Sequence, residues 1–313
     1  MASYALGCKV NQYESEAIAE LFAEKGYEVV SVDDEADVYI INTCTVTNFG
    51  DKKSRQLIRK VKRQNENAIV AVVGCYAQTA PEELAAVHGV NLVIGTKDKS
   101  KIVELVEDYQ AEQGVQNYVT DIMHERVFEP LEIKKLANRT RAYLKIQDGC
   151  SQFCSYCIIP YARGPIRSRQ PEDVIAEVKR LAENGFKEVV LTGIHVASYG
   201  KDLKTITLID IIRQVHEVEG IERIRFSSIE PNVVTEEFAA AMAELPKVCD
   251  HFHLSLQSGC DKTLKEMNRK YDTEKYRQAA ALLRKYLPDV AITTDIIVGF
   301  PCLLYTSDAA DDR

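Results

Sequence analysis

Three cysteines lie close together in the middle of the chain, at Cys150, Cys154 and Cys157, with the spacing CxxxCxxC. Three clustered thiolates can bind three irons of a cubane iron–sulfur cluster and leave the fourth iron without a protein ligand. Such an open iron can bind a substrate or cofactor, whereas a closed four-cysteine site is typical of electron transfer or structure. The spacing therefore predicts a site of chemistry, with these cysteines as the catalytic loop.

A structural zinc site and a redox thiol pair are the alternatives for this loop. Structural zinc takes four protein ligands, and no fourth Cys or His lies nearby in the sequence. Cys154-Ser155-Tyr156-Cys157 alone would match a thioredoxin-type CxxC. The presence of Cys150 and the repeated strand–helix units around the loop favour the open iron–sulfur site.

A second set of three cysteines is dispersed, but each member follows a predicted strand: Cys8 after 3–6, Cys44 after 38–42 and Cys75 after 69–73. The carboxyl ends of parallel strands share one edge of a sheet, so these cysteines are expected to converge there. The adjacent Gly7 and Gly74 permit tight turns and close backbone approach. Three unrelated buried cysteines are the alternative, but the repeated placement favours a shared metal site.

The order of the predicted elements indicates two α/β domains. In residues 1–110, strand-like runs alternate with helical patterns at 13–25, 51–64, 81–87 and 99–109; the strand-like runs include 28–32 and 92–94. This alternation predicts a doubly wound parallel sheet. Residues 111–138 are polar and are expected to form a connector. Further repeated units over 139–301 predict an incomplete partial β/α barrel, whose sites lie at the carboxyl ends of the strands.

Residues 302–313 continue neither a helix nor a strand pattern. Translated back to DNA, they fit a transposon-end adapter used in sequencing libraries. We therefore expect the natural protein to continue past Pro301, and the tail, including Cys302, is left out of the site.

Composition and charge narrow the class of protein. The chain has 313 residues, enough for two cores, and its formal net charge of -8 argues against whole-molecule attraction to nucleic acid. Nine cysteines without a small disulfide framework are typical of metal ligands or catalytic groups in a reducing compartment. No run resembles a secretory signal or a membrane span, so we expect a cytoplasmic protein without a membrane partner.

Local basic patches are the candidate RNA contacts. The predicted helix 51–64 places five basic residues on one arc, opposite apolar residues, and the alternative is an ordinary solvated surface; the basic residues are Lys52, Arg55, Arg59, Lys62 and Arg63. Three arginines that follow the catalytic loop, Arg163, Arg167 and Arg169, are the stronger candidates for binding phosphate.

The CxxxCxxC loop, with an aromatic residue before its last cysteine, resembles that of the radical S-adenosylmethionine (SAM) enzymes. From about Tyr4 to Pro301 the chain resembles the methylthiotransferases of that superfamily, whose N-terminal domain carries a second cluster on cysteines that match Cys8, Cys44 and Cys75. Residues 6–14, LGCKVNQYE, and 158–164, IIPYARG, are most similar to the type that acts on threonylcarbamoyladenosine (t6A) in tRNA.

The resemblance implies two 4Fe-4S clusters and SAM as cofactors. SAM would bind the open iron at Cys150, Cys154 and Cys157, and reductive cleavage would give a 5′-deoxyadenosyl radical. This radical would remove hydrogen from C2 of the modified adenosine 37 in the tRNA anticodon loop. The cluster at Cys8, Cys44 and Cys75 would supply the methylated sulfur, so that C2–H becomes C2–SCH3. An electron donor such as flavodoxin or ferredoxin is also implied.

Family members also carry a small C-terminal β-barrel that grips tRNA, and it is missing from this sequence. We therefore expect weak tRNA binding and impaired activity from the polypeptide as given.

Five residues are candidate SAM contacts by their place at predicted strand ends or in the loop: Tyr156, Gly193, Glu230, Ser255 and Gln257. Ordinary turn and core hydrogen bonding explains strand-end polar residues equally well. Alternative functions keep the chemistry but change the substrate to isopentenyladenosine in tRNA or a ribosomal-protein aspartate. A non-catalytic iron–sulfur electron carrier, or a metal-stabilised RNA-binding protein, is the alternative of another class.

Overall fold

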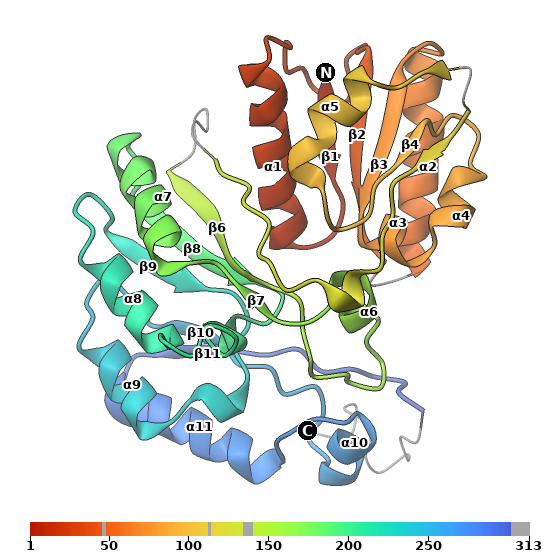
Figure 1. Ribbon diagram of the computed structural model, residues 1–313. Helices are drawn as coiled ribbons and strands as arrows, with labels where there is room; N and C mark the ends of the chain where they lie inside the picture. The colour runs from red at the N-terminus through yellow and green to blue at the C-terminus, as the bar shows by residue number, and fades with distance from the viewer. Residues whose placement is uncertain (46–47, 112–113, 134–139, 302–313) are drawn as a thin grey trace. The chain divides into compact units, whose positions relative to one another are not determined.

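The structure is a computed structural model that describes residues 1–45, 48–111, 114–133 and 140–301 (Figure 1). It forms two compact units, one of 1–138 with Ile158–Arg167 and the other of 139–157 with 168–313. The segment Ile158–Arg167, expected in the second domain, has its contacts with the first unit. The domain boundaries drawn from the sequence stay predictions, and residues 302–313 lie outside the described residues.

A parallel five-stranded sheet with the order β1-β2-β3-β4-β5 forms the centre of the first unit. Its strands are β1 (Ala2–Ala5), β2 (Val38–Thr43), β3 (Ile69–Gly74), β4 (Leu92–Val93) and β5 (Gln116–Asn117). Ala5 pairs with Asn42, and Thr43 pairs with Gly74, so the first three strands end at one edge.

Helices cover both faces of this sheet (Figure 1). They are α1 (Lys9–Glu24), α2 (Asn48–Gln64), α3 (Cys75–Thr79), α4 (Pro81–Ala85) and α5 (Ile102–Glu107), with short 3-10 turns at Lys99–Lys101 and Ile122–His124; α6 (Ile159–Arg163) also belongs to this unit. Successive strand side chains point to opposite faces. Tyr39 therefore packs in the core under α2, whereas Ile40 packs in the core under α1 and α5. The predicted doubly wound sheet is confirmed.

Two details of the first unit differ from the sequence prediction. Residues 28–32 are not a strand, because only Val30 pairs with the sheet, through a single bridge to Ala2. Conversely, the polar connector contains β5, which extends the sheet beside β4. A two-residue strand leaves no alternating pattern long enough to recognise.

The second unit contains parallel strands in a curled partial barrel. Its sheets have the orders β7-β6-β8-β9 and β10-β11, and single bridges at Ile224–Val248 and Ile229–Leu254 follow between them. The strands are β6 (Arg141–Asp148), β7 (Arg167–Ser168), β8 (Glu188–Gly193), β9 (Arg223–Phe226), β10 (His251–His253) and β11 (Ala291–Thr293). This arrangement confirms the predicted barrel class.

Five described helices lie between or beside these strands, and three of them begin at side-chain caps. They are α7 (Pro171–Glu183), α8 (Leu208–His216), α9 (Glu236–Ala243), α10 (Asp261–Glu266) and α11 (Thr273–Tyr286), with 3-10 turns at Val196–Ser198 and Pro231–Val233. The Thr207 side chain accepts from the Asp210 amide in a capping box that starts α8. Thr235 caps α9, and Asp272 caps α11. No described helix is both long enough and apolar enough to cross a membrane.

Glu188, at the start of β8, binds three arginines from neighbouring strands. Its carboxylate lies 2.6 Å from Arg141 Nε and 2.9 Å from both Arg223 Nε and Arg225 Nε. Burial raises the pKa of Glu188, but the hydrogen bonds from Arg223 and Arg141 outweigh it, so the pKa lies below its usual value. The ionised carboxylate therefore joins β8 to β6 and β9.

We expect Glu188→Gln to lower the free energy of unfolding by about 1–2 kcal/mol at pH 7, a modest loss because the arginines are partly exposed. A carboxyl with a lowered folded-state pKa stabilises the fold above its unfolded pKa, near 4.3. That stabilisation is lost as the pH falls through the folded-state pKa. Urea unfolding of both proteins at several pH values measures this, and an equal difference at pH 7 and at strongly acidic pH would contradict it.

Candidate functional site

The structure brings Cys8, Cys44 and Cys75 to one edge of the first sheet, as the strand pattern predicts. Cys8 is the residue before α1, Cys44 directly follows β2, and Cys75 begins α3 at the end of β3. The strands β1, β2 and β3 are adjacent and parallel, so their carboxyl ends meet. Cys44 and Cys75 are buried, whereas Cys8 is exposed.

Gly7 is required for the close approach of two of these cysteine loops. It has a φ of +96°, and a Cβ added to it would lie 2.5 Å from Cys44 Sγ. No other residue type combines that backbone angle with that contact. Gly74 likewise has a φ of +96°, and its Cβ would lie 2.4 Å from Asn42 Oδ1. Both glycines therefore serve the close approach expected from the sequence.

Asn11, in the first turn of α1, is a site residue that the sequence reasoning missed. Its Nδ2 donates to the carbonyl oxygens of Leu6, at 2.8 Å, and Thr43, at 2.9 Å. These carbonyls lie just before Cys8 and Cys44, so one buried amide holds both cysteine loops. The one feature of the sequence that could have identified Asn11 is its position three residues after the predicted cluster ligand Cys8.

Arg163, at the end of α6, completes this arrangement. It is fully buried, and its Nε donates to Cys75 Sγ at 3.2 Å. Its Nη2 donates to Asn11 Oδ1 at 2.6 Å, and its Nη1 donates to Glu14 Oε1, also at 2.6 Å. The Asn11–Arg163 pair therefore links all three cysteine loops of the first unit.

The prediction that Arg163, Arg167 and Arg169 bind phosphate is wrong for the structure as it stands, because all three are buried. Arg167 Nη1 donates to the carbonyl oxygens of Arg163 and Pro165. Arg169 forms an ion pair with Glu177. A guanidinium already paired inside the protein does not reach an RNA backbone.

Burial also sets the ionisation of Cys75. It raises the pKa of this thiol to about 11, and although the charge of Arg163 acts in the opposite direction, the charge of Cys8 raises the pKa further. A metal centre that bound Cys75 would displace the thiol proton.

The CxxxCxxC loop follows β6 in the second unit and is held in a tight conformation. Phe153 has a φ of +50°, and the Cys157 amide donates to the Cys154 carbonyl at 2.9 Å. The chain at the end of α10 supports the loop, because Asn268 Nδ2 donates to the Phe153 carbonyl at 2.8 Å. The Ser155 amide donates to the Met267 carbonyl at 3.1 Å. Cys154 is buried, and Cys150 and Cys157 are partly exposed.

An ionic group surrounds this loop. Arg269 Nη1 donates to Cys154 Sγ at 3.2 Å, and Arg269 Nη2 lies 3.5 Å from Glu230 Oε1. Burial raises the pKa of Glu230, but a hydrogen bond and the charge of His195, with the charge of Arg269, lower it overall. Burial raises the pKa of Cys150 to about 11, and the charges of Cys154 and Cys157 raise it further. Arg269, which no local motif marks, was missed from the sequence.

The candidate SAM residues have structural partners of their own. Glu230 is buried and also lies 3.4 Å from Gln152 Nε2. A Cβ on Gly193 would lie 2.8 Å from Gln147 Oε1, so this glycine makes room for a neighbouring side chain.

The other three candidates are less enclosed. The half-exposed ring of Tyr156 packs edge-on against the ring of Phe300, with 6.3 Å between the two ring centres. Ser255 and Gln257 follow β10 and are partly buried, and Gln257 has a φ of +72°. SAM binding by all five candidate residues stays a prediction.

Both donor sets consist of three free cysteines, which are the usual ligands of iron–sulfur clusters. Among the described residues, no three or more His, Cys, Asp or Glu side chains are grouped so that they could hold one ion. A cubane binds its cysteines through separate irons, so its ligands lie farther apart than those of one ion. Each triplet offers three cysteines, and in each an arginine nitrogen lies 3.2 Å from one sulfur.

Two family descriptions match the chain. Residues 1–95 match "Uncharacterized protein family UPF0004", and residues 144–302 match the "Radical SAM superfamily". The threonylcarbamoyladenosine tRNA methylthiotransferase MtaB of Bacillus subtilis is 48% identical over 96% of this chain and 67% of its own length. The protein of the same name from Aquifex aeolicus is 42% identical over 96% of this chain and 73% of its own.

A tRNA-2-methylthio-N(6)-dimethylallyladenosine synthase from Thermoanaerobacter is 40% identical over 94% of this chain and 64% of its own length. Among solved structures, the radical SAM methyltransferase TsrM from Kitasatospora setae is similar with a TM-score of 0.68, covering 98% of this chain and 68% of its own. The cobalamin-dependent SAM radical enzyme OxsB is similar with a TM-score of 0.63, and the match covers 95% of this chain and 49% of the OxsB chain. At 15% and 13% identity, these two likenesses show the fold alone.

Proposed function

Because this chain belongs to the methylthiotransferases of the radical SAM superfamily, we propose that it converts C2–H of t6A at position 37 of tRNA to C2–SCH3. The arrangement that supports this over other radical SAM reactions is the second cysteine triplet. Methylthio transfer needs a sulfur carrier besides the radical site, and Cys8, Cys44 and Cys75 lie together at one sheet edge.

We assign one 4Fe-4S cluster to each triplet. Cys150, Cys154 and Cys157 would hold the cluster that binds SAM, and Cys8, Cys44 and Cys75 would hold the auxiliary cluster. The bound cluster and SAM supply the one-electron chemistry that removes hydrogen from an unreactive carbon. The protein's own contribution is positioning: Asn268 and Met267 hold the first loop, and Asn11 holds two loops of the second triplet.

Arginines provide the second contribution. Arg269 and Arg163 each place a positive charge 3.2 Å from a cysteine sulfur. A cluster with its cysteine thiolates carries net negative charge, and hydrogen bonds to its sulfurs are among the factors that set its reduction potential. We infer that both arginines favour the reduced, more negative state of the cluster that they contact.

The t6A substrate is favoured over isopentenyladenosine by the order of similarity. Relatives named for t6A from Bacillus subtilis and Aquifex aeolicus are 48% and 42% identical to this chain, whereas at 40% identity relatives of both names occur. A tRNA substrate implies that the protein works in the cytoplasm, and the one-electron step needs a low-potential donor such as flavodoxin or ferredoxin.

Mass spectrometry of tRNA nucleosides tests the proposal. A strain that lacks the gene is complemented with the full-length gene, and its tRNA is digested to nucleosides. We expect 2-methylthio-t6A to disappear in the deletion strain and to return on complementation, with methylthiolated isopentenyladenosine unchanged. If complementation restored only methylthiolated isopentenyladenosine, the substrate would be isopentenyladenosine and not t6A. No change in either nucleoside would overturn the proposal.

A further inference from the structure

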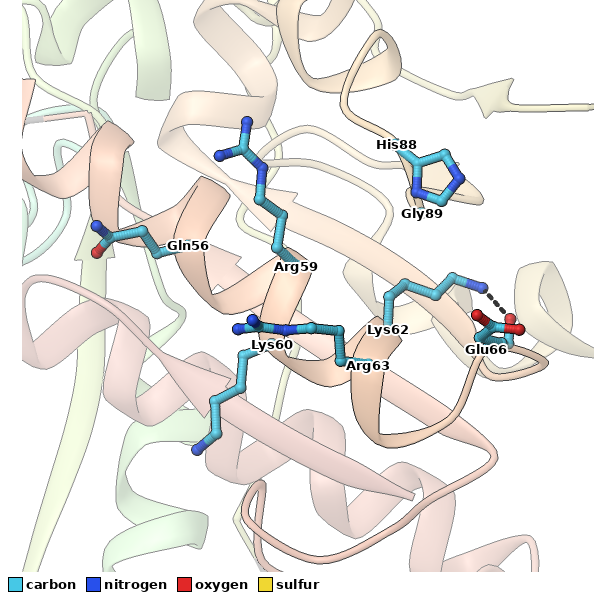
Figure 2. A pocket seen from close by; sticks show the side chains of 8 residues that line it. All are labelled: Gln56, Arg59, Lys60, Lys62, Arg63, Glu66, His88 and Gly89. Carbon is cyan, nitrogen blue, oxygen red and sulfur yellow. Dashed lines mark hydrogen bonds between the residues drawn. The ribbon is translucent and has the colours of Figure 1, made fainter.

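A basic groove lies along the outer side of α2 in the first unit, with a volume of about 950 Å³. Its residues are Gln56, Arg59, Lys60, Lys62, Arg63, Glu66, His88 and Gly89, and we call it the α2 groove (Figure 2). Arg59 and Arg63 are exposed and four residues apart, so they are neighbours on one face of the helix. Glu66 is the single acidic residue among those that line it.

The cations of the α2 groove differ in how firmly they are held. Lys62 is fixed, because its Nζ donates to the carbonyl oxygen of Glu66 at 2.8 Å (Figure 2) and to that of Ala68, also at 2.8 Å. Lys60 pairs with the exposed Asp33, a surface contact of little energy. Among the described residues, no ion pair or hydrogen bond engages the side chains of Arg59 and Arg63. Their guanidinium groups are therefore available to an external anion.

The basic face expected from the sequence is thus smaller than predicted. Arg55 turns to the protein itself, since it donates to the Tyr76 hydroxyl and lies 5.8 Å from the centre of that ring. The packing side of α2 is as predicted, with Ile58 and Val61 in the core. Gly89 leaves room for the Lys62 side chain, because a Cβ at this position would lie 2.4 Å from Lys62 Cγ.

The α2 groove differs from another groove of this acidic chain in the charge of the residues that line it. A groove between α7 and α8 in the second unit is lined by Lys179 but also by Glu183, Glu217 and Glu219. The chain as a whole has a formal net charge of -8. A concentration of cations on such a background attracts anions locally, where exposed charges act within about 10 Å of one another.

The side chains in the α2 groove favour a nucleic-acid backbone over a protein partner. None of its lining residues is an aliphatic, Phe, Tyr or Trp side chain, and His88 supplies a single ring, too little to stack successive bases. A protein interface would need apolar or aromatic anchors at its centre, and reading of single-stranded bases would need stacking platforms. Arginine pairs, by contrast, match phosphate oxygens through bidentate hydrogen bonds.

We propose that the α2 groove binds the sugar–phosphate backbone of tRNA, through Arg59 and Arg63, away from the cysteine edge of the sheet. The inference rests on the proposed function for the identity of the RNA. At 1.5 Å per residue, Arg59 and Arg63 lie about 16 and 22 Å along the axis from Asn48, the first residue of α2, which follows Cys44 by four positions in the sequence. Lys62 bonds to Ala68, directly before β3, so the groove lies at the opposite, amino edge.

The groove therefore positions the RNA and does not touch the reacting base. Backbone contacts set register and affinity without reading sequence. We expect removal of its charges to raise the KM for tRNA more than it changes kcat, and to do so for any tRNA substrate.

The experiment compares two double variants of the reconstituted protein that the full-length gene encodes. In Arg59→Ser with Arg63→Ser, the two available guanidinium groups of the groove are removed. The control, Lys179→Ser with Arg284→Ser, removes two exposed charges from the second unit and matches the net charge. Circular dichroism verifies that each variant is folded. Fluorescence anisotropy then measures the Kd for unmodified substrate tRNA at several salt concentrations, and steady-state assays give KM and kcat.

We expect the groove variant to bind tRNA roughly tenfold more weakly at low salt. The plot of log affinity against log salt should become less steep by about 1.4–1.8, the change expected for the loss of two phosphate contacts. The control should keep the slope and KM of the unaltered protein. Equal slopes and KM values in all three proteins would overturn the groove assignment and leave the proposed function standing.

Two other outcomes are also decisive. If the unaltered protein binds no tRNA at any salt concentration, both the proposed function and the groove assignment are overturned. If the groove variant keeps its tRNA affinity but is reduced more slowly by an acidic electron-transfer protein, the groove is a protein docking site, and the RNA assignment is overturned.

Discussion

A Cys154→Ala variant should form no 5′-deoxyadenosine from SAM and should keep roughly half of the iron of the unaltered protein. Cys154 is buried within the CxxxCxxC loop, and its sulfur accepts from Arg269 at 3.2 Å. Loss of this ligand leaves two cysteines in the loop, too few to hold a cubane with one open iron. The second triplet, Cys8, Cys44 and Cys75, is in the other unit, so its cluster should survive.

Iron analysis and chromatography of SAM cleavage products measure this result after anaerobic reconstitution. Cys249→Ala is the matched control, because Cys249 is a free cysteine of the same unit that belongs to neither triplet. The complementary variant, Cys75→Ala, should still cleave SAM but should form no methylthiolated nucleoside. Retention of SAM cleavage by Cys154→Ala would contradict the assignment of the radical site.

Arg163→Gln should lower the free energy of unfolding of the iron-free protein by about 3–5 kcal/mol. Arg163 and Glu14 are both fully buried and joined by two hydrogen bonds, of 2.6 and 3.1 Å. Removal of the guanidinium leaves the Glu14 carboxylate with Lys99, whose Nζ lies 3.5 Å away. A buried charge that loses its main partner destabilises strongly, so urea unfolding should show a large shift in midpoint.

Two further variants separate the ion pair from other effects of the substitution. Arg163→Lys should recover only part of the loss, because an ammonium group does not match the three acceptors Glu14, Asn11 and Cys75 together. The double variant Glu14→Gln with Arg163→Gln should be more stable than the sum of the single losses predicts. Arg59→Gln is the exposed control, expected within about 0.5 kcal/mol of the unaltered protein. An equally small loss in Arg163→Gln would refute the structural role.

Arg163 also tests the auxiliary cluster assignment through spectroscopy. With the radical-site cysteines replaced, only the second triplet, Cys8, Cys44 and Cys75, can hold a cluster. Loss of the charge beside Cys75 should make this cluster harder to reduce. An unchanged midpoint potential in electron paramagnetic resonance titrations would show that the Arg163–Cys75 contact does not tune it.

The sequence was informative wherever the determining interactions are local. The CxxxCxxC spacing is fixed within one loop, and strand–helix alternation follows from the side-chain periods of each element. These local patterns also placed Cys8, Cys44 and Cys75 at strand ends, which a parallel sheet then brings to one edge. They failed at 28–32, where a valine-rich segment forms only one bridge, at Val30.

Only the tertiary structure decided which polar residues surround these cysteines. Arg163 and Arg59 are equally basic in the sequence, yet Arg163 is buried against Glu14, 149 residues away, and Arg59 is exposed in the α2 groove. The fate of a charge depends on whether a distant partner offsets its desolvation, and no local pattern contains that partner. The sequence by itself therefore determined the cysteine sets and the fold class, and the tertiary structure decided that Asn11, Arg163 and Arg269 support them.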